Sequence, residues 1–376
     1  MNSPKKIVFV TGTRADFGKL KSLMNVIQED KNFELHVFVT GMHMLAKYGY
    51  TCEEVEKANF SNIHKFINQN VSDGMDHVLA KSILGLSDYV REIQPELIIV
   101  HGDRVEALAG ATVGALNNVL TGHIEGGEVS GTVDELIRHA VTKLSYAHFV
   151  ANEEAQDRLL QLGERLESTY VIGSPDIDVM NSGMLPSISE VKNRYEIDYD
   201  DYGVVIFHPV TTELDDLQSH IDILVNSLIS SERNYVVIYP NNDHGSELIF
   251  KAYERIEENT FFRVFPSMRF EYFLQLLKNA NFMIGNSSAG VREAPHFGVP
   301  TINIGSRQNN RVTLPSIANI AFDENQILNA IQDVDKESCK EVTVFGDGNS
   351  SDKFYKILQS KSFWSMEKQK FFVDLK

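Results

Sequence analysis

Short apolar runs alternate with longer segments of helical period along most of the chain. A first series of apolar runs is found at residues 6–10, 34–40, 97–101, 120–124, 148–151 and 170–172. A second series follows at residues 204–208, 235–239, 261–265, 282–284 and 301–304. Buried strands that alternate with amphipathic helices are typical of βαβ units, whose strands form a parallel sheet. The pattern therefore predicts an α/β protein with two doubly wound, Rossmann-like domains that face each other across a cleft.

The two series of strands are separated by residues 173–202, which contain two prolines, two glycines and many polar side chains. Such a composition is typical of a linker between domains. The chain has 376 residues, which is enough for two domains that each bury a core. We therefore expect an N-terminal domain at residues 1–175 and a C-terminal domain at residues 180–354.

The chain carries a formal net charge of −17, which argues against a nucleic-acid-binding protein, because such proteins spread Lys and Arg along a phosphate backbone. A small anionic ligand is still compatible with this charge, since a few local arginines and helix N-termini can hold it. No apolar run approaches the roughly 18 residues of a membrane span, and the first run is too short for a signal peptide. Only Cys52 and Cys339 are present, too few for a disulfide framework. We expect a soluble, cytoplasmic protein that does not act at membranes.

The loop after the first predicted strand reads Thr-Gly-Thr-Arg-Ala-Asp-Phe-Gly over residues 11–18 and runs into a helix. In doubly wound sheets, ligands bind beyond the carboxyl ends of the strands, and a helix N-terminus there attracts anions. Arg14 would add a positive charge beside a phosphate; alternatively, it is a solvated side chain on a tight turn. The loop lacks the G-x-G-x-x-G spacing of dinucleotide-binding proteins, and no acidic residue for a ribose follows the second strand. We therefore expect no nicotinamide cofactor.

Three acidic residues follow neighbouring predicted strands or begin the next helix. Asp103 comes just after the third run, Glu125 directly after the fourth, and Asp134 at a predicted helix start. Carboxylates at one edge of a sheet, with glycines beside them that let the backbone approach a ligand, suit acid–base catalysis. Alternatively, Asp103 and Asp134 are helix N-caps. Glu125 would then only pair with Arg104 or Arg138.

Histidines are interleaved with these acids, as His101, His123 and His139. A metal centre is therefore a competing interpretation. However, the spacing matches no helical H-E-x-x-H arrangement, and the ligands would have to come from separate strands. We expect neither a metal nor another cofactor.

The second half of the chain offers polar residues that suit the nucleotide part of a ligand. His208 and Asn241 lie at or just after the ends of two of its predicted strands. Ser287 and Ser288 follow a third strand and begin a helix, where their hydroxyl and backbone N–H groups would bind a diphosphate. Glu293, about one and a half turns further on, would reach a ribose. Alternatively, a serine only caps the helix, and His208 is a core histidine with satisfied hydrogen bonds.

Five motifs stand in order along the chain. They read Thr-Gly-Thr-Arg-Ala-Asp (11–16), His-Gly-Asp-Arg (101–104), His-Ile-Glu-Gly-Gly-Glu (123–128), His-Pro-Val-Thr (208–211) and Gly-Asn-Ser-Ser-x-Gly-Val-Arg-Glu (285–293). Together they resemble the hydrolysing UDP-N-acetylglucosamine 2-epimerases of sialic acid synthesis, over about residues 5–311. Non-hydrolysing relatives usually have Gly-Asp-Thr in place of Gly102-Asp103-Arg104 and Glu-Ala-Gly in place of Glu125-Gly126-Gly127. These two differences favour the hydrolysing branch.

The resemblance implies a fold similar to GT-B glycosyltransferases, with a C-terminal helix at about residues 355–376 returning to the first domain. It implies anti elimination of UDP to give 2-acetamidoglucal, then hydration to N-acetylmannosamine. A base and an acid must act on opposite faces of carbon 2, and the candidates are Asp103, Glu125 and Asp134. The departing diphosphate would be stabilised by Arg14, His208, Ser287, Ser288 and Arg307. The nucleoside would be held by Asn241 and Glu293.

Several alternatives stay open at this point. The nucleotide could be GDP, or the sugar could carry a second acetamido group. A glycosyltransferase of the same architecture would need an acceptor and would have no need for the clustered acids. A non-catalytic sensor would bind the nucleotide sugar without turnover. For a soluble enzyme of this size a homodimer is the expected assembly, with a tetramer as the alternative.

Overall fold

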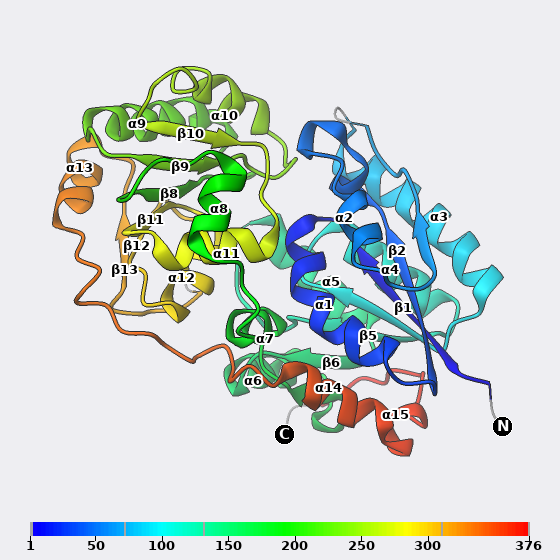
Figure 1. Ribbon diagram of the computed structural model, residues 1–376. Coiled ribbons are helices and arrows are strands. Elements are labelled where there is room, and N and C mark those ends of the chain that lie inside the picture. Colours follow the sequence, from blue (N-terminus) through cyan, green and yellow to red (C-terminus); the bar gives the residue numbers. More distant parts are fainter. Residues whose placement is uncertain (1–2, 71–72, 131, 310, 375–376) are drawn as a thin grey trace. The chain divides into compact units, whose positions relative to one another are not determined.

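The computed structural model describes residues 3–70, 73–130, 132–309 and 311–374. The chain divides into two compact units (Figure 1). The first unit comprises Met1–Glu128, Asp134–Gly183 and Val344–Lys376, and the second comprises Val129–Val133 and Met184–Thr343. The first unit is therefore built from both ends of the sequence, with most of the second unit inserted between them.

The first unit contains a seven-stranded parallel sheet in the order β3-β2-β1-β4-β5-β6-β7. Its strands are β1 (Lys5–Thr11), β2 (Phe33–Val39), β3 (Ile63–Lys65), β4 (Leu97–His101), β5 (Leu120–Ile124), β6 (Ala147–Val150) and β7 (Thr169–Val171). Residues Ile7–Phe9 and Leu97–Val100 are fully buried, because helices cover both faces of a parallel sheet. This burial explains the uninterrupted apolar runs of β1 and β4.

The helices of the first unit alternate with these strands. They are α1 (Arg14–Gln28), α2 (Cys52–Lys57), α3 (Met75–Ile93), α4 (Val105–Leu116), α5 (Val133–Leu144), α6 (Glu153–Gln161), α7 (Pro175–Asn181), α14 (Ser350–Gln359) and α15 (Lys361–Trp364), with short 3-10 helices η1 (Gly41–Met44), η2 (Ala46–Tyr48) and η3 (Leu166–Ser168). Helix α1 begins at a capping box, in which Thr13 and Asp16 each accept the other's backbone N–H. Its start directly after β1 is thereby fixed by local sequence.

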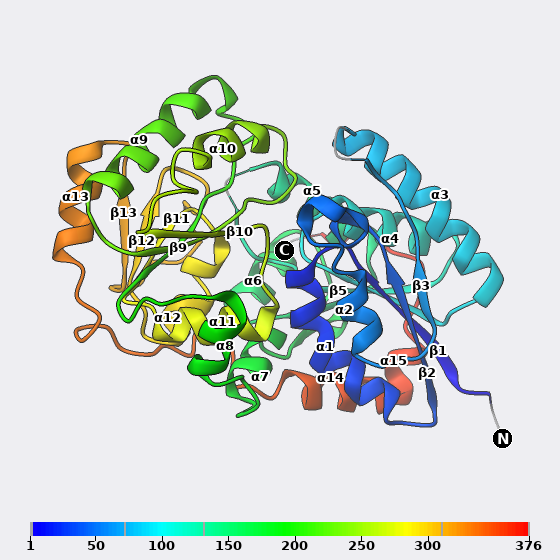
Figure 2. The same ribbon diagram turned by 45° about the horizontal axis from the view of Figure 1, so that its top comes forward.

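The last two helices complete the core of the first unit. Phe354 and Phe363 are buried, and Phe354 lies 6.4 Å from Phe9 and 4.9 Å from Phe149 between ring centroids. The carboxylate of Asp178 accepts the backbone N–H groups at the start of α14, which explains why the helix begins at Ser350. Helix α14 packs beside α1 (Figure 2). Where the resemblance implies one helix at about 355–376, the structure has two short helices and then an irregular segment.

The second unit contains a six-stranded parallel sheet in the order β10-β9-β8-β11-β12-β13. Its strands are β8 (Gly203–Ile206), β9 (Tyr235–Ile238), β10 (Phe262–Phe265), β11 (Phe282–Gly285), β12 (Thr301–Ile304) and β13 (Ile317–Ile320). Its helices are α8 (Ile188–Tyr195), α9 (Leu217–Ser230), α10 (Ser246–Tyr253), α11 (Phe270–Asn279), α12 (Glu293–His296) and α13 (Glu324–Asp333), with 3-10 helices η4 (Leu214–Asp216) and η5 (Ser288–Gly290). Apolar side chains from α9, α10 and α13 form a core against one face of this sheet.

The predicted fold class is confirmed, because both units contain doubly wound parallel sheets. In the first unit, the chain turns from one half of the sheet to the other between β1 and β4; in the second unit, it does so between β8 and β11. The loops after these four strands therefore lie at the point where open α/β sheets bind ligands. Every helix in the described ranges is too short or too polar to span a bilayer.

Candidate active site

The loop after β4 places Asp103 against a buried arginine. Gly102 has a φ of +70°, a left-handed conformation that lets the chain turn sharply beyond the strand. The guanidinium of Arg138, on α5, donates to the Asp103 carboxylate and, at 3.2 Å, to the carbonyl oxygen of Glu128. Burial disfavours the charge of Arg138, but Asp103, Glu128 and Glu125 outweigh it and raise the pKa of the arginine. A permanently charged group thus stands beside Asp103.

Glu125 occupies a strained position at the end of β5. Its φ is +65°, in the left-handed region that a glutamate rarely adopts, and its side chain is almost fully buried. Oε1 of Glu125 lies 3.4 Å from Nζ of Lys19, 3.4 Å from Nε2 of His101 and 3.5 Å from Oγ of Ser174. Lys19 is also 3.6 Å from Oδ2 of the buried Asp176. Such strain persists only where the surrounding structure imposes it, which is typical of functional sites.

Asp134 lies half-buried in the first turn of α5. It precedes Arg138 by four residues, so the two side chains project from the same face of the helix. Glu135, one position further, is 3.7 Å from Arg138 and 3.2 Å from His139. Helix α5 therefore brings Asp134 to the side of the first unit on which Asp103 meets Arg138.

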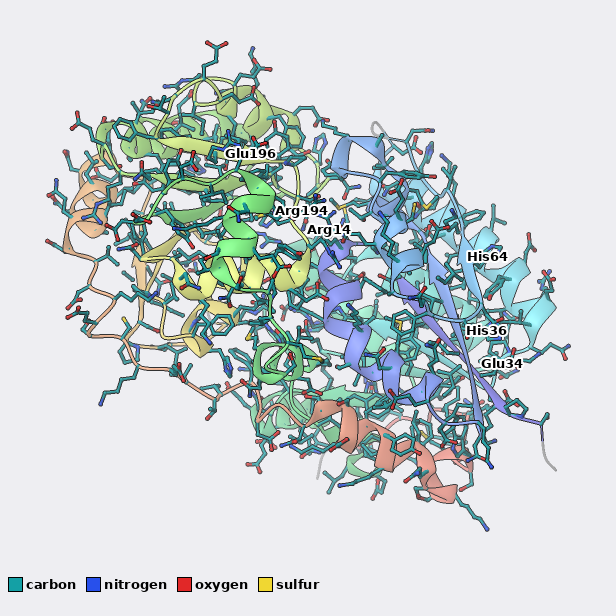
Figure 3. All side chains as sticks on the ribbon, in the orientation of Figure 1. Arg14, Glu34, His36, His64, Arg194 and Glu196 are labelled. Atoms are coloured by element: carbon teal, nitrogen blue, oxygen red, sulfur yellow. The ribbon has the colours of Figure 1, made fainter. Side chains whose placement is uncertain are left out.

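Arg14 is the first residue of α1 (Figure 3). Its Nη2 donates to Oε1 of Glu54 at 2.6 Å. Its side chain is only 16% exposed, so the alternative of a solvated arginine is wrong. The buried side chain of Glu106 packs against the loops that follow β1 and β2. A Cβ atom added at Gly12 would lie 2.9 Å from Cδ of Glu106, and one added at Gly41 would lie 2.6 Å from its Oε1. Burial raises the pKa of Glu106.

In the second unit, His208 and Asn286 join the loops after β8 and β11. The backbone N–H of His208 donates to Oδ1 of Asn286 at 2.7 Å, and Nδ2 of Asn286 returns a bond of 2.8 Å to the His208 carbonyl. Nδ1 of His208 accepts the backbone N–H of Asn241 at 3.1 Å. In the neutral ring the proton therefore sits on Nε2, which makes that nitrogen a donor.

The segment after β11 is shaped by close backbone approach. Gly285 has a φ of +132°, and a Cβ atom there would lie 2.1 Å from the carbonyl oxygen of Ile206, so only glycine fits. The Ser287 hydroxyl accepts the N–H of Ala289 at 3.3 Å and caps η5. A capping role was the alternative interpretation of this serine. Ser288 is the first residue of η5.

The carbonyl oxygen of Asn286 accepts hydrogen bonds from two side chains of the loop after β12. Arg307 donates to it at 3.2 Å and Gln308 at 2.8 Å. Glu293 begins α12 and is 3% exposed. The second unit thus gathers His208, Asn241 and Arg307 around one buried asparagine.

Five residues that contact the candidate site residues or their neighbours in the two units were not identified from the sequence: Lys19, Glu106, Asp176, Asn286 and Gln308. Lys19 could have been found, because it falls on the apolar stripe of α1 with Leu20 and Leu23, where a lysine needs a buried partner. The other four depend on which segments meet in space. In the described part of the chain, no three His, Cys, Asp or Glu side chains are grouped as metal ligands.

Comparison with known proteins identifies the family. Residues 25–359 match the family described as UDP-N-acetylglucosamine 2-epimerase. A UDP-N-acetylglucosamine 2-epimerase of Neisseria meningitidis serogroup B is 46% identical over 375 residues, covering 99% of each chain. The Legionella pneumophila UDP-N,N'-diacetylbacillosamine 2-epimerase (hydrolyzing) is 32% identical, covering 95% of this chain and 96% of its own. Polysialic acid biosynthesis protein P7 of Escherichia coli is 34% identical, covering 87% and 85%.

Solved structures show the same fold. The Methanocaldococcus jannaschii UDP-GlcNAc 2-epimerase in complex with UDP-GlcNAc and UDP has a TM-score of 0.78 at 20% identity, covering 94% of this chain and 99% of its own. UGT73P12 of Glycyrrhiza uralensis, a protein of the GT-B fold, has a TM-score of 0.57 at 10% identity, covering 96% of each chain. With a matching family model over most of its length and three relatives above 30% identity, this chain belongs to the UDP-N-acetylglucosamine 2-epimerase family.

Proposed function

We propose that this chain is a hydrolysing UDP-N-acetylglucosamine 2-epimerase, which converts UDP-N-acetylglucosamine and water to UDP and N-acetylmannosamine. The observation that carries the proposal is the 46% identity to the Neisseria epimerase over 99% of the chain. A relative whose name includes hydrolyzing, at 32% identity, supports water as the second substrate. The similarity to a polysialic acid biosynthesis protein supports a role in supplying the sugar for sialic acid synthesis.

The chemistry requires more than one acid–base group. The hydrogen on carbon 2 is not acidic, so it can leave only as the bond from carbon 1 to the diphosphate oxygen breaks. The C–H electron pair becomes the double bond of 2-acetamidoglucal, and the C–O pair leaves with UDP. Water then adds at carbon 1 while carbon 2 takes a proton on the opposite face. A base and an acid are therefore needed on different sides of the sugar.

We assign this work to Asp103, Glu125 and Asp134 in the first unit. Support comes from the carboxylate of Asp103 on the charged Arg138 and from Asp134 on the same helical face as that arginine. Further support comes from the strained backbone of Glu125 and from the buried Lys19 ammonium beside its carboxylate. We expect the two positive charges, of Arg138 and Lys19, to hold these acids in fixed positions when substrate is absent.

We assign the nucleotide to the second unit, as a C-terminal nucleotide-binding domain. The departing diphosphate would be stabilised by His208, Ser287, Ser288 and Arg307. Arg14, in the first unit, stays a candidate for binding phosphate. The nucleoside would be held by Asn241 and Glu293. Support comes from the proton on Nε2 of His208, which follows from its bond to Asn241. We further expect a cytoplasmic homodimer, with a tetramer as the alternative.

The decisive experiment uses deuterated water. The protein is incubated with UDP-N-acetylglucosamine in D2O, and the released sugar is identified by NMR. We expect UDP and N-acetylmannosamine that carries deuterium on carbon 2, because that carbon is deprotonated and then reprotonated from solvent. Simple hydrolysis would release N-acetylglucosamine without deuterium, and this product would rule out the epimerase.

A second candidate substrate is a diacetamido sugar linked to UDP or GDP. It is favoured by the relatives of Legionella pneumophila and Campylobacter jejuni, both 32% identical and named for N,N'-diacetylbacillosamine. Parallel incubations with the UDP- and GDP-linked forms of both sugars, compared by kcat/KM, separate the candidates. The proposal predicts the highest value for UDP-N-acetylglucosamine.

A further inference from the structure

The irregular C-terminal segment places one ammonium group against the end of α5. Nζ of Lys370 donates to the carbonyl oxygens of Thr142, at 3.1 Å, and Ser145, at 2.8 Å. It also donates to Oε2 of Glu164 at 2.5 Å. An ammonium has three N–H donors, so these three acceptors use all of them. The last carbonyls of a helix have no partner within the helix and attract positive charge, so Lys370 fastens this end of α5.

Glu164 is the buried counterion of Lys370. Its side chain is 2% exposed, and it accepts from Lys143 and from Nε2 of His148, each at 2.9 Å. Burial acts to raise the pKa of Glu164, but His148 and Lys370 outweigh it and lower the pKa to about 2. The carboxylate is therefore charged at neutral pH and keeps its pair with Lys370.

A chain of hydrogen bonds leads from Lys370 to the loop of Asp103. Lys370 holds the carbonyl of Thr142, whose hydroxyl lies 3.3 Å from Nδ1 of His123. Nε2 of His123 donates to the carbonyl oxygen of Gly102 at 2.8 Å. Burial lowers the pKa of His123 to about 3, so the ring is neutral, carries its proton on Nε2 and accepts from Thr142. Every link therefore has a defined donor and acceptor.

Helix α5 provides a second connection, because Asp134 stands in its first turn and Arg138 near its middle. Arg138 binds the carboxylate of Asp103. A shift of α5 along its axis would thus move two of the proposed catalytic acids together. Lys370 binds the carbonyls of Thr142 and Ser145 at the C-terminal end of α5, opposite Asp134, where it would resist such a shift.

We propose that Lys370 is a positioning residue for catalysis, which holds α5 and, through Thr142 and His123, the loop that carries Asp103. The inference rests on the proposed function, since it concerns the acids assigned there. It differs from that proposal in its residues, because Lys370 lies on the C-terminal segment and touches none of the three acids through any contact described above.

Lys370→Ala tests the inference. We expect kcat to fall about tenfold or more, because misplacement of a reacting group by about 1 Å can cost about 10²-fold. The dissociation constant of UDP should stay unchanged, since we assign UDP to the second unit. Lys368→Ala is the matched control, an exposed lysine two positions away, and should keep wild-type kcat. Wild-type kcat in Lys370→Ala would overturn the inference.

Chemical rescue separates positioning from a loss of folding. A cavity of about 710 Å³ lies beside Lys370, bordered by Tyr146, Glu164, Arg165, Tyr170 and Phe371 among others. Propylammonium has the atoms that Lys370→Ala removes, and this cavity gives it a route to the vacated position. We expect propylammonium to restore kcat in the variant and to leave Lys368→Ala unaffected. Tetramethylammonium, which has no N–H donor, should not restore activity at equal ionic strength; equal rescue by both ions would contradict the inference.

A double variant covers the case in which Lys370→Ala does not fold. Lys370→Met with Glu164→Gln removes both charges of the pair, so no buried carboxylate is left without its lysine. We expect low kcat here too, because the carbonyls of Thr142 and Ser145 still lack the ammonium donor; wild-type kcat would overturn the inference. Amide hydrogen exchange gives a readout without turnover. Faster exchange in residues 101–104 and α5 is expected, whereas change confined to residues 365–374 would contradict the inference. If the wild type is inactive, the proposed function is refuted. Amide hydrogen exchange then still tests whether Lys370 positions α5 and the loop of Asp103.

Discussion

Nε2 of His123 donates a hydrogen bond of 2.8 Å to the carbonyl oxygen of Gly102, the residue immediately before Asp103. The histidine lies on β5 and the glycine follows β4, so this bond ties together two adjacent strand ends. It fixes the backbone on which Asp103 stands, at a glycine in the left-handed conformation. Two variants of His123 should therefore differ in activity.

His123→Gln keeps an N–H donor at about the position of Nε2, whereas His123→Leu keeps volume but no donor. We expect a smaller loss of kcat for the glutamine variant, which gives up only the bond from Thr142, than for the leucine variant, which loses both bonds. The leucine variant should fall at least about tenfold, because a misplaced acid loses alignment with the substrate. Steady-state kinetics with UDP-N-acetylglucosamine provide the measurement. Equal activity of the two variants would show that the bond to Gly102 is dispensable.

The proposed acids can be tested by isosteric amides. Asp103→Asn, Glu125→Gln and Asp134→Asn should each lower kcat by about 10²-fold or more, the usual scale for a positioned acid or base. UDP affinity, measured by calorimetry, should persist because the nucleotide residues are unchanged. Asp157→Asn, an exposed aspartate on α6, is the control and should turn over normally. Any of the three that keeps wild-type turnover leaves the catalytic set.

The nucleotide site can be tested at two serines. Ser287→Ala combined with Ser288→Ala should weaken UDP binding by about 1–3 kcal/mol, as expected for lost hydrogen bonds to a charged group. Ser338→Ala, an exposed serine of the same unit, provides the control. Titration calorimetry gives the affinity, and an unchanged value in the double variant would place the diphosphate elsewhere.

Buried histidines should make the stability of the first unit fall with acid. Burial lowers the pKa of His43 to about 4 and of His123 to about 3, and it also lowers the pKa of His148. Above the ordinary histidine pKa of 6.5 these rings are neutral in both states. Below this pH the histidines bind protons in the unfolded chain but stay neutral in the folded chain. The free energy of unfolding therefore decreases as pH falls from about 6.5 toward about 4.

The free energy of unfolding should change by about 1.4 kcal/mol per pH unit for each of these histidines. Urea unfolding between pH 7 and pH 5 measures it, and His43→Gln should reduce the slope by one such step. His77→Gln, at an exposed histidine of α3, is the matched control. A slope that His43→Gln does not change would mean that His43 is protonated in the folded protein.

Glu106 is buried beneath the loops after β1 and β2, where burial raises its pKa. Glu106→Gln keeps its shape beneath Gly12 and Gly41 and should retain both stability and activity. Glu106→Ala leaves a cavity there and should lower the free energy of unfolding by at least about 1 kcal/mol. Denaturant unfolding of the two variants tests this. A larger loss in the glutamine variant than in the alanine variant would indicate that the glutamate is charged.

The central strands could be predicted from sequence because their burial leaves a continuous apolar run. The strands at 97–101, 120–124 and 301–304 agree with the structure to the residue. Strands β3 and β13 were missed, since both are short edge strands whose residues are only partly buried. An edge strand that is exposed on one side has little need for apolar side chains.

The candidate site was predictable where chemistry follows a strand end directly. Asp103, Glu125 and His208 were selected as candidates in this way, and their roles stay predictions. The partners of these residues were harder, because Asp176 and Asn286 acquire their roles from segments distant in sequence. Lys370 is the clearest case, more than 200 positions from each of its three partners. No local pattern in the C-terminal segment points to such contacts.

The discontinuous first unit has a consequence for how the protein is made. Synthesis proceeds from the N-terminus, so the rings of Phe9 and Phe149 emerge from the ribosome long before Phe354, which packs on both. In the meantime the first unit lacks α14 and α15 and leaves apolar surface uncovered. The second unit, apart from residues 129–133, is continuous, so its core is the first that a nascent chain can close. The half of the molecule that is translated first is thus the half that matures last.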